Sequence, residues 1–343
     1  MMIHDLPLAN LRGTFARDAS LARHTTWRVG GNADLLYAPA DRDDLAQFVR
    51  ALPAALPVTV LGLGSNVLVR DGGIRGAVVL MHDPGAVLAV ADGLIYADAG
   101  VASPKLARFA AMHGARGAEF LAGIPGTVGG ALAMNAGCYG GETWRHVARV
   151  ETLGRDGRFA VRTPDAFAIG YRSVERRDGA PLEPFTGAWF SFPQGDVGTS
   201  RAAIKSLLAQ RIATQPLSLP NAGSVFRNPP GDHAARLIES CGLKGFAIGG
   251  ARVSELHANF IVNPERRARA ADIEALLAHV RDTVHARTGV LLEPEVRIIG
   301  EARMSAAREA KPSEGPKGPS TRDRDEADAR SRAAPPKSKE AEA

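Results

Sequence analysis

The sequence predicts an α+β fold, because strand patterns, hairpin turns and helices follow one another in mixed order without an internal repeat. Two hairpin turns are predicted at Asp92–Gly93 and Asp156–Gly157, where Asp-Gly stands between apolar runs. The strands flanking these turns are expected at Val87–Ala91, Leu94–Asp98, Arg149–Leu153 and Arg158–Arg162. A doubly wound parallel sheet would need strands and helices in regular alternation, so it is disfavoured.

Helices are predicted where apolar residues recur at helical spacing beside capping residues. The expected helices are Asp41–Leu52, Pro104–His113, Thr199–Ala213, Ala234–Cys241 and Ile273–Arg287. Ser103 is expected to cap the second of these, and Gly289 to close the last. The expected apolar face of the third consists of Ile204, Leu207, Leu208 and Ile212. Further strands are expected at Ala33–Tyr37, Val58–Leu63 and Glu295–Ile299.

Length and composition indicate a folded body followed by a different C-terminal tail. The chain has 343 residues, of which 45% are hydrophobic, and this length suits roughly two or three domains. From Met304 onward Lys, Arg, Glu, Asp, Pro, Ser and Ala dominate. Because such a segment cannot bury enough apolar surface to offset its ordering entropy, residues 304–343 are expected to be disordered.

Charge and cysteine usage limit the partners and the compartment. The net charge of +5 is spread over alternating basic and acidic residues, which disfavours nucleic acid as a partner and suits an anionic small molecule. Cys138 and Cys241 form no C-x-x-C pair, which fits a reducing compartment. Residues 1–12 do not resemble a signal peptide, and no segment reaches the roughly 18 apolar residues of a membrane span. We therefore expect a cytoplasmic protein without membrane association, and the sequence contains no metal-ligand spacing.

Two glycine-rich loops are candidates for binding a ligand through the backbone. The first, Leu61–Val67, follows a predicted buried strand and contains Gly62 and Gly64. Successive N–H groups in such a loop can bind an anion. However, Val67 stands where the third glycine of a dinucleotide-binding G-x-G-x-x-G motif would be, and no crossover helix follows. Taken alone, such a loop is more often a tight turn.

The second loop, Gly123–Gly137, is the stronger candidate. Pro125-Gly126 marks a turn, and Thr127 is expected to cap a short helix at Val128–Met134. The N-terminal end of that helix, with its free N–H groups, suits a pyrophosphate. A solvent-exposed loop would not carry so many small and apolar residues in a row.

Several short segments form a common pattern in fixed order between about His24 and Gly300. They are His24–Gly31, Leu61–Val67, Gly123–Gly130, Asn135–Gly137, Gly170–Arg172, Gln215–Leu217, Asn221–Asn228, His257–Asn263 and Glu295–Arg297. Through them the chain resembles the UDP-N-acetylenolpyruvoylglucosamine reductases, flavoproteins of peptidoglycan precursor synthesis. The short passage from Arg172 to Arg211 resembles the shorter, second type of this family. The segment after Arg172, Ser173–Arg177, departs from the family pattern, which commonly has a second small hydroxyl residue and an aromatic residue there.

The resemblance implies the two-subdomain FAD-binding fold of the vanillyl-alcohol-oxidase (PCMH) type, with a third α+β domain for the substrate. The expected domain bounds are 1–80 together with a last strand at 295–303, then 81–198, and 199–294. The implied cofactor is FAD, with NADPH as hydride donor. The implied reaction reduces the enolpyruvyl ether of UDP-N-acetylglucosamine enolpyruvate to UDP-N-acetylmuramate, and a monomer is expected.

The resemblance assigns chemistry to three residues. Ser224 matches the family's proton donor. Arg172 would bind the pyruvyl carboxylate and stabilise charge that develops on it, and Glu295 would help to polarise that carboxylate, for which a protonated acid is one option. Without the family context, Ser224 reads as a turn serine, Arg172 and Glu295 read as solvated residues, and Glu293 rivals Glu295.

The remaining assignments concern cofactor and substrate contacts. The implied FAD contacts are Arg28, Leu61, Gly62, Leu63, Gly64, Ser65, Asn66, Val67, Gly123, Ile124, Pro125, Gly126, Thr127, Gly129, Gly130, Asn135, Gly137 and Arg297. The candidate sugar-nucleotide contacts are Tyr171, Arg211, Gln215, Asn228 and His257, with Arg211 favoured for a phosphate. His257 and Asn259 could instead be structural polar residues. Cys138 is interpreted as a small buried residue near the flavin rather than a redox group.

Two other functions stay open at this point. Another FAD oxidoreductase of the same fold would often tether its flavin through a histidine, and neither glycine loop contains one. A sugar-nucleotide-binding protein without turnover is opposed by the joint presence of Arg172, Ser224 and Glu295.

Overall fold

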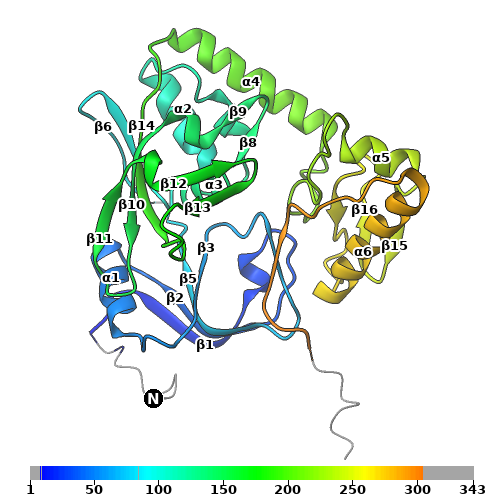
Figure 1. Ribbon diagram of the computed structural model, residues 1–343, viewed down its shortest axis with the longest axis horizontal. Helices are drawn as coiled ribbons and strands as arrows, with labels where there is room; N and C mark the ends of the chain where they lie inside the picture. Colours follow the sequence, from blue (N-terminus) through cyan, green and yellow to red (C-terminus); the bar gives the residue numbers. More distant parts are fainter. Residues whose placement is uncertain (1–7, 9, 84, 304–343) are drawn as a thin grey trace, which may run out of the picture. The chain divides into compact units, whose positions relative to one another are not determined.

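The computed structural model describes residues 8, 10–83 and 85–303, which form four clusters of buried apolar side chains (Figure 1). Mixed sheets, hairpins and scattered helices confirm the predicted α+β class. The predicted tail at 304–343 and most of segment 1–12 lie outside the described residues. No helix in the described ranges is long and apolar enough to cross a membrane.

The first part of the chain is a four-stranded sheet with the order β1–β2–β5–β3. Its strands are β1 (Thr14–Ser20), β2 (Asn32–Ala38), β5 (Ile74–Leu80) and β3 (Val58–Leu61). β2 and β3 both run parallel to β5, and α1 (Arg42–Ala51) connects them. The helix predicted at Asp41–Leu52 is confirmed within one residue at each end, and Asp41 is its N-cap, accepting from Asp44 N at 2.9 Å. The Phe48 ring of α1 stacks on Tyr37 of β2 and fixes the helix to the sheet.

The second part is a five-stranded antiparallel sheet with the order β11–β10–β14–β7–β6. Its strands are β11 (Phe159–Arg162), β10 (Val147–Leu153), β14 (Phe185–Phe190), β7 (Leu94–Asp98) and β6 (Leu88–Ala91). Both predicted hairpins are confirmed. Asp92 and Gly93 both have positive φ, of 53° and 74°, as a two-residue hairpin turn requires.

Helices and short 3-10 turns cover this second sheet. They are α2 (Ser103–Met112), η3 (Glu119–Gly123), α3 (Val128–Ala133), η4 (Thr143–His146), η5 (Pro164–Ala166) and α4 (Val197–Thr214). α4 packs on α2 and η3, and its Ile204 belongs to the same apolar cluster. The boundary expected between residues 198 and 199 thus falls inside α4.

Two details of these helices differ from the sequence prediction. α2 begins at Ser103 with Ala102 as its N-cap, because the Ala102 carbonyl oxygen already accepts the first intrahelical bond, from Leu106 N at 3.2 Å. The predicted Ser103 cap is therefore wrong, and its hydroxyl is buried without a partner among the described residues. On α4, Ile212 is 68% exposed because the end of the helix extends beyond the apolar cluster.

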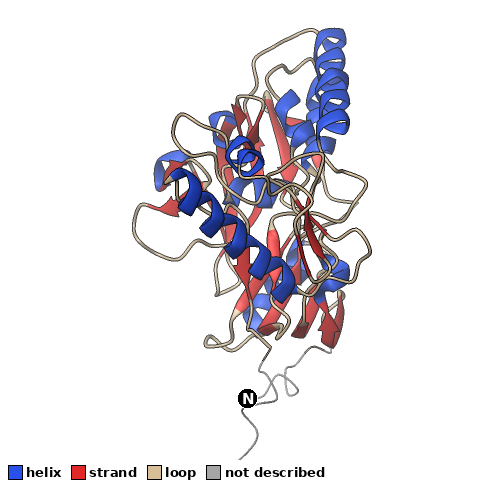
Figure 2. Cartoon of the chain, turned by 90° about the vertical axis from the view of Figure 1, so that its right-hand side faces the viewer, coloured by secondary structure: helices blue, strands red, loops and turns tan. Residues whose placement is uncertain are grey.

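The third part contains α5 (Ala234–Ser240), β15 (Ala247–Ile248), β16 (Ala251–Val253), β17 (Ile261–Val262) and α6 (Ala270–Thr288). α6 packs on α5 and on the small sheet of β15, β16 and β17. Figure 2 is turned so that this part faces the viewer and shows a long helix in front of strands. Gly289 ends α6 in the left-handed conformation (φ 74°), as predicted.

Shorter elements complete the described chain. They are η2 (Leu21–His24), β4 (Val67–Val69), β8 (Gly137–Cys138), β9 (Gly141–Glu142), β12 (Phe167–Gly170), β13 (Ser173–Arg176) and β18 (Arg297–Ile299). β18 pairs in parallel with β4, so the chain returns to the first part after the third. β18 begins two residues later than predicted, and Glu295 lies just before it.

Trp27 and Asp71 attach the third part to the first. Trp27 is fully buried in the apolar cluster of the third part, and its Nε1 donates to Ile261 O at 2.7 Å. Asn263 Nδ2 in turn donates to Trp27 O at 3.0 Å. The Asp71 carboxylate accepts from the first two N–H groups of α6, both at 2.9 Å. This side chain therefore caps a helix that lies about 200 residues away in the sequence.

Candidate active site

A cavity of about 730 Å³ is lined by residues from all three parts of the chain. Both glycine loops form walls of it. The other walls come from the β12–β13 hairpin, the end of α4, the segment around Ser224 and the segment that leads into β18. Most of the residues assigned from the sequence are therefore brought together in one place.

The first glycine loop connects β3 to β4 and lines the cavity over its whole predicted length, Leu61–Val67. Gly64 has φ +62°, and a β-carbon there would overlap the carbonyl oxygen of His24. The N–H groups of Gly62, Leu63 and Ser65 donate no hydrogen bond within the described part of the chain. Backbone donors are thus available toward an anion.

The second loop contacts the first directly. A β-carbon at Gly62 would lie 2.5 Å from Thr127 Oγ1, so glycine is needed for the two loops to approach. Thr127 caps α3, as predicted, and accepts from Gly130 N at 3.4 Å. β-carbons at Gly126 and Gly130 would contact only Ser65 and Thr127 respectively. Since both glycines line the cavity, side chains there would fill it.

A second cavity of about 400 Å³ adjoins the first. The two share Val60, Gly62, Thr127, Gly130, Ala133 and Leu182 in their walls, so both glycine loops contribute to the boundary between them. The residues that line the second cavity alone are mostly apolar, and they include Val49, Val58, Met81, Leu153 and Pro181. Together the cavities can accept a long ligand with an anionic middle and an apolar end.

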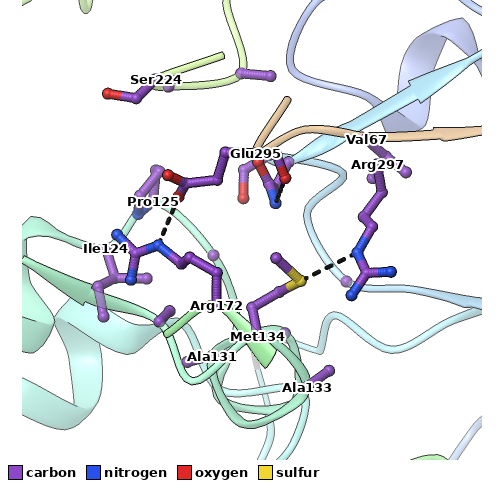
Figure 3. Close-up of a pocket in the computed structure, with 18 of the residues that line it drawn as sticks. Val67, Ile124, Pro125, Ala131, Ala133, Met134, Arg172, Ser224, Glu295 and Arg297 are labelled. Carbon is purple, nitrogen blue, oxygen red and sulfur yellow. Dashed lines mark hydrogen bonds and ion pairs between the residues drawn. The ribbon is translucent and has the colours of Figure 1, made fainter. Parts of the chain in front are cut away.

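Arg172 and Glu295 form an ion pair inside the first cavity (Figure 3). Arg172 Nε donates to Glu295 Oε1 at 2.7 Å, and the two side chains are only 16% and 15% exposed. Burial raises the pKa of Glu295, while Arg172 and Arg227 lower it, and the pKa stays above its usual value. The carboxyl group is therefore closer to a protonated acid than a solvated glutamate is.

The backbone at Arg172 explains how this side chain reaches the cavity. Gly170 pairs with Ser173, which leaves Tyr171 and Arg172 as a two-residue hairpin tip. Arg172 has φ +55°, a conformation that costs a non-glycine residue roughly 1–2 kcal/mol. Its NH2 also donates to Gly137 O at 2.7 Å, which ties the hairpin to the second loop.

Ser224 lies across Glu295 from Arg172 in Figure 3. A backbone bridge joins Phe226 to Pro294. Next to it, Glu295 N donates to Val225 O at 2.8 Å. The segments that carry Ser224 and Glu295 are thus paired, and both residues line the cavity.

Arg211 and Gln215 enter the cavity from the end of α4. Arg211 Nε donates to Gln215 Oε1 at 2.8 Å, and burial lowers the pKa of Arg211. Arg211 forms no ion pair with any described acidic residue. A partly desolvated guanidinium without a carboxylate partner favours an anionic ligand such as a phosphate.

Tyr171, Asn228 and Arg297 also line the cavity. Tyr171 is 49% exposed, with the Arg172 guanidinium carbon 5.2 Å from its ring centre. Asn228 Oδ1 accepts from Ala234 N at 3.1 Å, so it also supports the start of α5. Arg297 Nε donates to the sulfur of Met134 at 3.4 Å.

Four predicted contacts do not line the first cavity: Arg28, Gly129, Asn135 and His257. Arg28 has φ +61° and donates to Arg23 O instead. Gly129 packs on Ala99, where a β-carbon would lie 2.9 Å from that alanine, and it faces only the second cavity.

Asn135 and His257 both make hydrogen bonds within the protein. Asn135 is 3% exposed, and its Nδ2 donates to Gly170 O at 3.1 Å, which supports the hairpin that carries Arg172. His257 Nδ1 accepts from Asn259 N at 3.3 Å, and its ring meets Phe260 edge-on. The open interpretation of His257 and Asn259 as structural polar residues fits this geometry.

Several further cavity residues were not among the contacts assigned from the sequence, although some of them lie within its motifs. They are Thr59, Val60, Ala131, Ala133, Met134, Ala136, Cys138, Ser173, Val174, Glu175, Leu182, Ala222, Gly223, Phe226, Asn259, Phe260 and Ile299. Most are apolar walls whose position depends on tertiary contacts. The Cys138 thiol donates to Phe120 O at 3.0 Å, and burial raises its pKa to about 11, which agrees with a structural role. The described residues contain no group of three or more potential metal ligands.

Comparisons with known proteins agree with this site. A family model for the C-terminal domain of UDP-N-acetylenolpyruvoylglucosamine reductase matches residues 215–299, and one for an FAD binding domain matches residues 33–161. The UDP-N-acetylenolpyruvoylglucosamine reductase of Thiobacillus denitrificans is 56% identical over 306 residues, covering 85% of this chain and 94% of that protein. The reductase of Methylococcus capsulatus is 57% identical over 293 residues, covering 85% and 95%.

A solved structure extends the similarity to the fold. The crystal structure of UDP-N-acetylenolpyruvylglucosamine reductase from Thermus caldophilus matches with a TM-score of 0.69 and 33% identity, over 84% of this chain and 99% of that chain. The expected FAD-binding fold is confirmed by this match and by the FAD binding domain. Since relatives above half identity cover most of the chain, it belongs to the UDP-N-acetylenolpyruvoylglucosamine reductase family.

Proposed function

We propose that this chain reduces UDP-N-acetylglucosamine enolpyruvate to UDP-N-acetylmuramate with NADPH, through bound FAD, in peptidoglycan precursor synthesis. The observation that carries this proposal is the single cavity lined by both glycine loops and by Arg172, Ser224 and Glu295. Relatives that carry the name of this reductase are more than half identical over most of the chain.

The two glycine loops would hold the FAD pyrophosphate. The free N–H groups of the Gly62–Ser65 turn and the open space above Gly126 and Gly130 support this assignment. We assign the adjoining apolar cavity to the adenosine half, because it lies on the other side of Thr127 and Gly130 from the ion pair. When bound, FAD supplies the hydride chemistry between NADPH and the enolpyruvyl double bond.

Arg172 would bind the pyruvyl carboxylate and stabilise the negative charge that develops on it as hydride arrives at the terminal carbon. Glu295, whose pKa is raised by burial, would orient Arg172 and, when protonated, would donate to the same carboxylate. Ser224 would then give its hydroxyl proton to the ether-bearing carbon. Glu295 accepts only from Arg172 Nε, so the remaining N–H groups of the guanidinium could bind the substrate carboxylate while the ion pair stays closed.

Arg211 and Gln215 would bind the nucleotide diphosphate, and Tyr171 and Asn228 would contact the sugar nucleotide beside it. Support comes from the Arg211 guanidinium, which has no carboxylate partner among the described residues, and from the position of all four residues in the cavity wall. One chain supplies all the residues of the site, so a monomer suffices for activity. We place the enzyme in the cytoplasm, where nucleotide sugars and NADPH are available.

An anaerobic two-step spectral experiment tests this function. The purified protein should be yellow, NADPH should bleach the flavin, and the enolpyruvyl sugar nucleotide should restore the colour without oxygen. A protein that binds FAD and the nucleotide sugar without restoring colour would be a binding protein rather than this enzyme. Flavin that stays with the acid-precipitated protein would instead indicate a tethered-flavin oxidoreductase of the same fold.

A further inference from the structure

Ser224 is held by its chain neighbours rather than by contacts of its own. Within the described part of the chain, Ser224 forms no hydrogen bond or ion pair. Before it, Gly223 has φ +75°, and its N–H donates to Asn221 Oδ1 at 2.9 Å. After it, the Val225 N–H donates to the carbonyl oxygen of Asn259 at 3.0 Å. The direction of the Ser224 hydroxyl therefore depends on how firmly these neighbours are fixed.

The Asn259 side chain pairs with both backbone groups of Phe226. The Phe226 N–H donates to Asn259 Oδ1 at 3.0 Å, and Asn259 Nδ2 donates to Phe226 O at 2.8 Å. Asn259 is only 3% exposed. Because both ends of its amide are engaged with the backbone, this side chain acts on the segment next to Ser224, although it also lines the cavity.

The segment held by Asn259 also sets the position of Glu295. The Glu295 N–H donates to Val225 O at 2.8 Å, and the Arg227 N–H donates to Glu293 O at 2.9 Å. These two bonds lie on either side of the bridge that joins Phe226 to the 293–295 segment. Asn259 therefore fixes the segment 224–227, which carries Ser224 and is hydrogen-bonded to the segment 293–295 that carries Glu295.

His257 provides a second layer of support. The Asn259 N–H donates to His257 Nδ1 at 3.3 Å, and the His257 ring packs edge-on against Phe260. Burial lowers the pKa of His257, which favours the neutral ring, and the bond from the Asn259 N–H requires the tautomer in which Nδ1 carries no proton. Its place in the chain of contacts explains why a residue expected to touch substrate lies outside the cavity wall.

We infer that Asn259 is a positioning residue that fixes the Ser224 hydroxyl relative to Glu295 for proton donation to the substrate. The inference rests on the proposed function, in which Ser224 is the proton donor. Misplacing a positioned group by about 1 Å can cost roughly 100-fold in rate. Reduction of the flavin by NADPH needs no proton from Ser224, so the effect should fall on the second half-reaction alone.

The test compares both half-reactions in rapid-mixing experiments on FAD-loaded Asn259→Ala and Thr288→Ala. Thr288 is the control, since its side chain also makes two hydrogen bonds in the third part of the chain, to Val284 O and from Val290 N, and none of these residues lines the cavity. We expect Asn259→Ala to slow flavin reoxidation by the enolpyruvyl substrate by 10-fold or more. Flavin reduction by NADPH and the Kd of the substrate should stay within 2-fold of wild type, and Thr288→Ala should leave both rates within that range.

A double variant identifies the residue through which Asn259 acts. If it acts through Ser224, Ser224→Ala/Asn259→Ala should reoxidise no more than 2-fold slower than Ser224→Ala alone. If the rate losses of the two single variants multiply in the double variant, the inference is overturned. It is also overturned if Asn259→Ala slows both half-reactions equally, or if this variant reoxidises within 2-fold of the wild-type rate. If Asn259→Ala does not fold, Asn259→Ser replaces it, because its hydroxyl can still pair with one Phe226 group and the slowing should be smaller.

Failure of the proposed function gives a different result. A wild-type reoxidation rate in Ser224→Ala would remove the proton-donor role, and the inference about Asn259 would fall with it. A slow Ser224→Ala together with a fast Asn259→Ala would overturn only the inference and leave the proposed function standing.

Discussion

Arg172 Nε lies 2.7 Å from Glu295 Oε1, and this ion pair connects residues 123 positions apart in the sequence across the cavity. One partner stands at a hairpin tip with φ +55°, and the other lies just before β18. Since both side chains are largely buried, the contact fixes the direction of each, and Arg172 offsets part of the rise that burial causes in the pKa of Glu295. The first prediction concerns this pair.

Arg172→Lys should slow flavin reoxidation by the enolpyruvyl substrate by about 100-fold, which is the usual cost of losing a preorganised donor to a developing anion. Lysine keeps the charge but lacks the fork that can pair with two oxygens at once. Stopped-flow absorbance of the flavin measures this rate. Flavin reduction by NADPH should be unchanged, and an equal loss in both steps would contradict the assigned role.

Gly126→Ala should weaken FAD binding by roughly 10-fold, because overpacking a fitted site commonly costs 1–3 kcal/mol. The new methyl group would meet only Ser65 Oγ, at 3.3 Å, and would otherwise point into the cavity. Fluorescence titration of the apoprotein with FAD gives the Kd. Gly198→Ala in α4 is the control and should leave the Kd unchanged, because its methyl group would likewise meet one side-chain oxygen, Asp196 Oδ1 at 3.2 Å, but lies outside the cavity wall. If the two variants bind FAD equally well, the second loop does not hold the cofactor.

Arg211→Met should raise the KM for the enolpyruvyl sugar nucleotide by roughly 10- to 100-fold while kcat changes little, as loss of a charge-assisted phosphate contact predicts. The melting temperature of the ligand-free protein should not fall, because Arg211 has no described acidic partner to lose. Arg201→Met, at an exposed position of the same helix, serves as the control. A fall in kcat with an unchanged KM would place Arg211 in the chemistry rather than in nucleotide binding.

Asp44→Asn should destabilise the protein at pH 7 by about 2–3 kcal/mol, as expected when a buried carboxylate loses charged hydrogen bonds. Asp44 is fully buried and accepts from the Tyr37 hydroxyl, from Ala40 N at 2.9 Å and from Arg12 N at 2.8 Å. Burial alone would raise the pKa of Asp44, but these bonds together lower it. Denaturant unfolding measures the difference in the free energy of unfolding between the two proteins.

The pH dependence of that difference follows from the direction of the shift. A lowered folded-state pKa contributes stability above the unfolded pKa of about 3.9, and this contribution is lost as pH falls through the folded-state value. The gap between wild type and Asp44→Asn should therefore shrink below about pH 4. If the difference in the free energy of unfolding is the same at pH 7 and pH 3, the loss comes from altered packing of the side chain rather than from the lost charge.

Local chemistry decided which elements the sequence could predict. The Asp92–Gly93 turn and the Thr127 cap are specified by residues within four positions of the element, and the structure contains both. The β12–β13 hairpin was not predicted, because its tip, Tyr171–Arg172, carries neither glycine nor asparagine. β14 was missed as well, although it is the central strand of the second sheet.

In the site, the sequence indicated which residues come together but not which partner each side chain contacts. Family motifs assigned Arg172, Ser224 and Glu295 to one site, and the three residues line the same cavity. The same motifs assigned Arg28 to FAD, but Arg28 does not line that cavity, and its guanidinium donates to Arg23 O. They could not show that Asn135 supports the hairpin that carries Arg172, because that role depends on a contact with Gly170, 35 residues away.

Trp27 and its neighbour Thr26 have a consequence for how the two ligands influence each other. The Thr26 N–H donates to Gly64 O at 3.1 Å in the first glycine loop, while the next side chain is embedded in the third part and donates to Ile261 O. Opening either contact disturbs the other. Binding of FAD should therefore raise the affinity for the nucleotide sugar, and the nucleotide sugar should raise the affinity for FAD by the same factor. Amide exchange at Ile261 should then slow when FAD binds, even though the cavity wall does not include this residue.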